Sequence, residues 1–190
     1  GGGVHGICID TFLLENGGFT REQLRIVEPH ETVLGSFATR ARQCRMRTLR
    51  STFVHHVDVD PFSLETFADD RGRNGKLVST EGYPDRPTLD LFLDHARDTV
   101  ERRSLADCHV EATVRGVRED RDSLRIETDD GPLYSRRVVL AVGLGDRPTY
   151  PEWTTALPED APLTHVWDEE FDPTAATEFD GETVVVGGGI

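Results

Sequence analysis

The sequence is nearly without lysine and has no long apolar run. Only Lys76 among its 21 basic residues is a lysine, and 35 acidic residues bring the formal charge to −14. This negative charge makes nucleic acid and anionic membranes poor partners. Many acids, with arginine in place of lysine, are typical of a protein from a high-salt cytoplasm, and GC-rich coding bias is the alternative explanation. Since no stretch approaches membrane-span length and no signal peptide opens the sequence, we expect a cytoplasmic protein.

Paired cysteines are lacking as well. Cys8, Cys44 and Cys108 are scattered and form no C-x-x-C motif. This spacing argues against a disulfide framework, a zinc site and a redox-active disulfide close in sequence. The stretch His55-His56-x-Asp58-x-Asp60 contains metal-ligating residue types. Adjacent side chains in an extended chain point apart, so we predict no metal site there.

The apolar patterns of the first half predict helices alternating with a short strand. The expected helices cover residues 4–16, part of 30–44, and 60–68, where Asp60-Pro61 has the composition of a helix start. A strand is expected at 24–28 and a loop at 69–86. The clearest helix follows Pro87, because apolar residues recur there at helical spacing. They are Leu89, Phe92, Leu93, Ala96 and Val100.

The second half contains strand patterns. Apolar and polar residues alternate over 110–114 and 124–128, and Asp130-Gly131 predicts a hairpin turn. Residues 138–142 are apolar throughout, as expected for a strand buried on both faces. A proline-rich stretch over 146–163 has the composition of a linker. Glu182 to Val186 predicts a new strand that leads into glycines.

The chain opens with the pattern Gly1-x-Gly3-x-x-Gly6. In a dinucleotide-binding turn the first glycine permits a tight turn, the second lets the backbone approach a pyrophosphate, and the third lets the helix pack closely on the sheet. The pyrophosphate then lies at the helix N-terminus, where free N–H groups and the helix dipole favour negative charge. We therefore predict that these three glycines bind a dinucleotide.

An acidic residue follows at the spacing that such a site needs. Glu28 lies 22 residues after Gly6, at the end of the predicted strand. Its carboxylate can accept hydrogen bonds from the hydroxyls of the adenosine ribose. A carboxylate there repels a 2′-phosphate, so this first site suits FAD or NAD rather than NADP. A solvated acid at a strand end is the alternative interpretation.

The segment Ala141-Val142-Gly143 with Pro148 has an A-x-G-x4-P pattern. It resembles the A-T-G-x4-P segment of two-dinucleotide flavoproteins, and the order of elements resembles theirs from the first glycine turn to the second. The resemblance implies that Ala141 and Gly143 lie at the FAD site and that a backbone position at Val114 holds the adenine. It implies a second, NAD(P)-binding turn at Gly187 and Gly189.

This resemblance implies an α/β, Rossmann-like fold with a parallel sheet, helices and an antiparallel β-meander. We expect an FAD-binding domain over residues 1–145 that lacks its first strand, a linker over 146–181, and the truncated start of an NAD(P)-binding domain over 182–190. The expected cofactors are FAD and NAD(P)H, and the expected partner is a small-molecule substrate. The organic chemistry then belongs to the cofactor, so no catalytic side chain is predicted.

Within these flavoproteins the chain is most similar to flavin-dependent monooxygenases of the lysine/ornithine N-hydroxylase-like group. Pro84-Asp85-Arg86 is similar to their P-x-R segment, and His165 lies where they carry a histidine ahead of the second nucleotide domain. A pyridine-nucleotide reductase or electron-transfer flavoprotein is one alternative. A non-catalytic module that binds FAD or another nucleotide is the other.

Two further clusters have more than one interpretation. Arg45, Arg47 and Arg50 can reach the FAD pyrophosphate or a substrate carboxylate through bidentate contacts, and ordinary salt bridges are an equal alternative. We assign Arg50 to the cofactor site. The loop from His55 to Asp60 either lines the flavin ring or is a surface or helix-capping loop.

Overall fold

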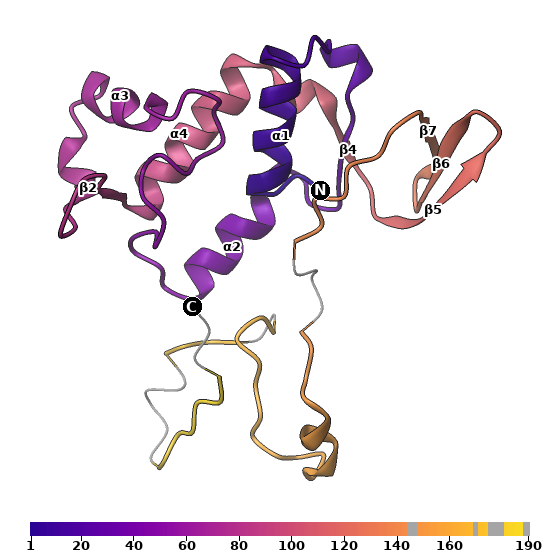
Figure 1. Cartoon of the computed structure of the whole chain (residues 1–190). Helices are drawn as coiled ribbons and strands as arrows, with labels where there is room; N and C mark the ends of the chain where they lie inside the picture. The colour runs from indigo at the N-terminus through magenta and orange to yellow at the C-terminus, as the bar shows by residue number, and fades with distance from the viewer. Residues whose placement is uncertain (144–147, 169–170, 175–180, 188–190) are drawn as a thin grey trace.

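The computed structural model describes the chain except for residues 144–147, 169–170, 175–180 and 188–190. Figure 1 shows a helical body from which an antiparallel meander projects on one side, with the C-terminal segment below. Two strands of the body pair in parallel, and the meander has three antiparallel strands. The predicted α/β class, with a parallel sheet, helices and a meander, is thereby confirmed.

The first helix and strand follow the glycine turn. Helix α1 covers Val4–Glu15 and ends before Gly18, whose φ of 68° is left-handed and easily adopted by glycine. Strand β1 covers only Ile26–Glu28, because Leu24 and Arg25 are not paired. Helix α2, Gly35–Gln43, lies within the stretch predicted to be partly helical.

The middle of the body corrects two predictions. Helix α3 covers Ser63–Asp70 rather than 60–68, because Asp60 accepts a hydrogen bond from Phe62 N (3.0 Å) in a turn that precedes the helix. The predicted loop 69–86 contains the end of α3, and its later part pairs as the short antiparallel strands β2 (Leu77–Val78) and β3 (Arg86–Pro87).

Helix α4, Leu89–Arg102, confirms the helix predicted after Pro87. Thr88 caps it by accepting a hydrogen bond from Leu91 N. All five apolar residues predicted for one face are buried, and Leu91 is buried with them. The helix therefore packs its apolar stripe into the core.

The predicted strand pattern over 110–114 belongs to two strands. Strand β4 (His109–Glu111) pairs in parallel with β1, and β5 (Val114–Asp120) begins the meander. Strands β6 (Ser123–Thr128) and β7 (Gly131–Ser135) complete it, and the predicted hairpin is present with its two-residue turn at Asp129-Asp130, one position earlier than predicted. Gly131 has a φ of 106°, a conformation that glycine adopts without strain.

Two strand predictions were wrong. Residues 138–142 form no strand and are not buried on either face, since Leu140 is 73% exposed. Glu182 to Val186 also forms no strand, and Val185 is 82% exposed. A strand needs a neighbour that accepts and donates its backbone hydrogen bonds. No described strand lies beside either segment.

The main hydrophobic core lies among α1, β1 and the three helices of the crossover to β4. Its buried residues extend from Ile7 to Cys108. In the part of the chain that the structure describes, no helix is both long and apolar enough to cross a membrane.

Candidate functional site

The glycine turn leads directly into helix α1. Gly3 is the N-cap in an extended conformation, and Ile7 N donates the first helical hydrogen bond to Gly3 O (3.0 Å). The amides of the first turn precede that bond and have no partner within the helix. The first turn holds no acidic side chain. This helix end is therefore suited to an anion.

Two of the three predicted glycines, Gly1 and Gly6, have a steric reason to lack a side chain. A Cβ on Gly1 would lie 2.5 Å from Ala141 O, and a Cβ on Gly6 would overlap Gly1 O. A Cβ on Gly3 would meet nothing within 4 Å, so it would fill the open space in front of the helix. The structure thus brings Gly1, Gly6 and Ala141 together and leaves Gly3 facing free space.

Glu28 lies at the same turn. Gly2 N donates a hydrogen bond to Glu28 Oε2 (2.7 Å), and the residue is 8% exposed. His30 Nε2 lies 3.7 Å from Glu28 Oε1. Leu34 N donates to Gly2 O (2.7 Å) from a left-handed conformation, φ 65°. Such a strained backbone outside glycine is found most often at functional sites.

The first residue of the meander lies close to this turn in the fold. Ala112 N donates to Glu28 O (3.1 Å) just after β4 ends, and Val114 follows two residues later. Val114 is 42% exposed. Val114 therefore comes two residues after the backbone position that bonds to Glu28 at the end of β1.

The other predicted site residues lie elsewhere or are less well defined. Arg50 is exposed beside β3, beyond the C-terminal end of α2. Gly143 and Gly187 have left-handed φ values of 61° and 95° and open space around them. Gly189 lies outside the described residues.

The comparisons with known proteins agree with this geometry. A sequence model of a family described as FAD-NAD(P)-binding matches residues 1–145. The chain belongs to the FAD-NAD(P)-binding family. No match was found among curated proteins or among solved structures. Family membership shows a flavin- and nucleotide-dependent oxidoreductase whose cofactors are FAD and NAD(P)H.

The turn of this FAD-NAD(P)-binding chain fits a dinucleotide. The helix N-terminus offers amides to a diphosphate, and the absence of a Cβ at Gly3 leaves that approach open. When bound, FAD supplies the redox chemistry by exchanging a hydride with NAD(P)H. The protein's part is to bind the cofactor, orient it and exclude water.

Sequence reasoning missed Gly2 and Leu34, whose backbones hold Glu28 and α2 at the turn. The Gly1-Gly2-Gly3 run was the available signal for Gly2. For Leu34 no signal existed, because leucine rarely adopts a positive φ.

Sequence reasoning also missed a buried polar cluster formed by the loop 56–58 and α4. Asp58 accepts hydrogen bonds from Arg102 (2.9 Å) and Arg103 (2.8 Å), and its side chain is 3% exposed. The rings of His56 and His95 meet edge to face at 4.9 Å. No group of three or more possible metal ligands exists among the described residues.

Burial dominates the electrostatics of this cluster. Burial, with a smaller contribution from the neighbouring His56, lowers the pKa of His95 to about 4. Burial likewise lowers the pKa of His56. Both rings are therefore neutral near pH 7, and His95 Nε2 lies 2.8 Å from Ser63 Oγ. The cluster ties the loop to α4, as expected for a structural loop.

Proposed function

We propose that the protein is a flavin-dependent, NAD(P)H-using monooxygenase that oxygenates a small-molecule substrate. The separation of the three thiols favours this function over that of a disulfide reductase, and it is the observation on which the proposal depends. Cys8 lies half-buried on α1, Cys44 is exposed after α2, and Cys108 is buried before β4. Burial raises the pKa of Cys108, which disfavours the reactive thiolate.

The proposal assigns roles to the residues of the glycine turn. The amides at the start of α1 bind the FAD diphosphate, and Glu28 accepts hydrogen bonds from the adenosine ribose. The backbone at Val114 holds the adenine. The hydrogen bond of Ala112 N to Glu28 O, two residues before Val114, supports this assignment.

The reaction class is tested by following NAD(P)H oxidation and O₂ uptake in the flavin-loaded full chain. We expect O₂ uptake to rise when an amine or a ketone is added. NAD(P)H oxidation that instead depends on a disulfide or a quinone would show a reductase. Flavin or nucleotide binding without any turnover would favour a non-catalytic module.

Flavin retention tests the turn. Gly3→Leu is expected to leave the chain folded, because no atom lies near the new Cβ, and to abolish flavin retention because the side chain blocks the diphosphate. Gly75→Leu is the matched control, since Gly75 also has open space and lies outside the turn. Unchanged flavin content in Gly3→Leu would overturn the diphosphate assignment.

The ribose role is tested at Glu28. Glu28→Ala is expected to weaken FAD binding at least tenfold, because hydrogen bonds to a charged acceptor contribute about 1.5–3 kcal/mol. Glu111, which is exposed and pairs with Glu28 in the parallel ladder, provides the control Glu111→Ala. Equal FAD affinity in both variants would refute the role of Glu28.

A further inference from the structure

Positive charge is concentrated in one stretch of this acidic chain. Residues 32–57 contain five arginines and no aspartate or glutamate. Arg40 and Arg45 contact the C-terminal segment, at Trp167 and Thr174. The remaining arginines, Arg42, Arg47 and Arg50, form no ion pair within the described residues. A surface of positive charge therefore exists in a molecule whose formal charge is −14.

The backbone places Arg50 opposite Arg86. Thr48 pairs with Thr88 in an antiparallel bridge, and Leu49 N donates to Pro87 O (3.0 Å). Further along, Phe53 N donates to Asp85 O (2.9 Å). Between these two hydrogen bonds, residues 50–52 lie on one segment and Arg86 lies on the other, so Arg50 and Arg86 belong to facing segments.

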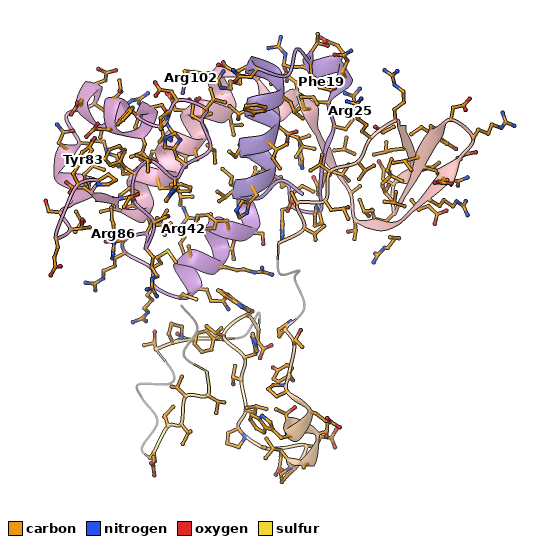
Figure 2. All side chains as sticks on the ribbon, viewed as in Figure 1. Phe19, Arg25, Arg42, Tyr83, Arg86 and Arg102 are labelled. Atoms are coloured by element: carbon orange, nitrogen blue, oxygen red, sulfur yellow. The ribbon has the colours of Figure 1, made fainter. Side chains whose placement is uncertain are left out.

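Both arginines belong to the outward face of this pairing. Leu49 and Pro87 are buried, whereas Arg50 and Arg86 are exposed. Figure 2 shows Arg86 on the side of the body that carries β2, away from the meander. Val78, which is opposite Arg86 in β2, is exposed as well. The two guanidinium groups thus share one solvent-facing surface.

Facing like charges destabilise a fold unless something offsets them. Asp85 and Asp90 flank the pair, but neither forms an ion pair with Arg50 or Arg86 among the described residues. An anion held between the two guanidinium groups would offset the repulsion. Each guanidinium can donate two parallel hydrogen bonds to a carboxylate or a phosphate.

We propose that Arg50 and Arg86 form a binding site for the anionic group, a carboxylate or a phosphate, of a small molecule. Helix α2 has nine residues, a length of about 13 Å, and begins beside the glycine turn, and Arg50 comes seven residues after its C-terminal end. This placement favours an anionic substrate over the diphosphate of FAD. Only the choice of a substrate, rather than FAD, as the molecule that carries the anionic group rests on the proposed function.

Calorimetric titration of the full chain with sodium malonate or sodium phosphate, at constant ionic strength against sodium chloride, tests the site. We expect saturable binding of at least one of the two anions. Arg50→Gln and Arg86→Gln should each weaken it about tenfold or more, and Arg42→Gln should not. Malonate binding identifies a carboxylate ligand, and phosphate binding alone identifies a phosphate ester.

A second measurement separates ligand binding from a structural role. At low salt without added anion, Arg50→Gln should raise Tm by about 1–2 °C, because it removes one of two facing positive charges. The proposal is overturned if neither anion binds saturably, if Arg42→Gln weakens binding as much as Arg50→Gln, or if Arg50→Gln lowers Tm. These measurements need no flavin, so loss of the proposed oxygenase activity would leave them unaffected.

Discussion

The body of the protein and its C-terminal region both contain apolar segments. Those of the body are buried, whereas those of the C-terminal region are exposed. Leu105 in the body is fully buried, whereas Leu140 is 73% and Val185 is 82% exposed. The segments 138–142 and 184–186 have the composition of buried strands, yet no described strand lies beside them. The difference shows that an apolar run specifies a preference for burial, and that a neighbouring element decides whether burial occurs.

The largest expected effect is the contrast between two leucines. Leu105→Ala should lower the free energy of unfolding by about 3 kcal/mol, because it leaves a cavity in the core. Leu140→Ala should change it by less than about 0.5 kcal/mol, as at most exposed positions. Urea unfolding of both variants measures the difference. Similar losses would mean that residues 138–142 are buried in solution.

The body is also expected to respond to acid through the buried His95 and the half-buried Asp10, whose protonation has opposite effects on stability. His95 has a folded pKa of about 4, below the value near 6.5 of an unfolded histidine. It therefore removes stability as the pH falls from 6.5 to 4. Burial raises the pKa of Asp10 to about 6 from 3.8, so Asp10 adds stability as the pH falls from 6 to 4.

Variants at the two positions should separate these contributions. Between pH 7 and pH 4.5, Asp10→Asn should lose about 2 kcal/mol more stability than the wild type. His95→Gln should lose about 2 kcal/mol less. Urea unfolding at both pH values gives the comparison. Parallel pH dependences in the two variants would contradict the assigned signs.

An effect of similar size is expected from the ion pairs of α4. Asp58→Asn should cost about 2 kcal/mol of unfolding free energy, because it removes the charge of a buried carboxylate that both Arg102 and Arg103 contact, although each arginine keeps one other acidic partner. Asp94, whose side chain is 34% exposed, pairs with Arg73 and Arg97. Asp94→Asn is the control and should cost less than about 1 kcal/mol. Equal costs would show that burial does not distinguish the two clusters.

Sequence reasoning succeeded where a pattern is local. The apolar spacing of α4 and the hairpin between β6 and β7 depend on neighbouring residues alone. The helix was confirmed, and the hairpin is present with its turn one residue earlier than predicted. The approach of Gly1 to Ala141 involves residues far apart in sequence, and only a resemblance suggested it. The positive φ of Leu34 depends on tertiary contacts, so no local pattern predicts it.

The smallest expected effect concerns the contact between the two regions. Arg40 on α2 lies 5.5 Å from the ring centre of Trp167, and Gln43 Nε2 donates to Asp168 O (2.6 Å). An exposed cation–π contact contributes only about 0.5–1 kcal/mol. We therefore expect Arg40→Gln to leave the unfolding of the body almost unchanged and to release the C-terminal segment locally.

Tryptophan fluorescence detects that release, because the chain has only two tryptophans. In a Trp153→Phe background, Trp167 is the single reporter, and Arg40→Gln should shift its emission to longer wavelength. Arg42→Gln, two positions further along α2, should leave the emission unchanged. If both variants had the parental spectrum, the C-terminal segment would not rest on α2 in solution. The apolar residues of the two regions would then differ in exposure only because the C-terminal segment makes no contact with the body.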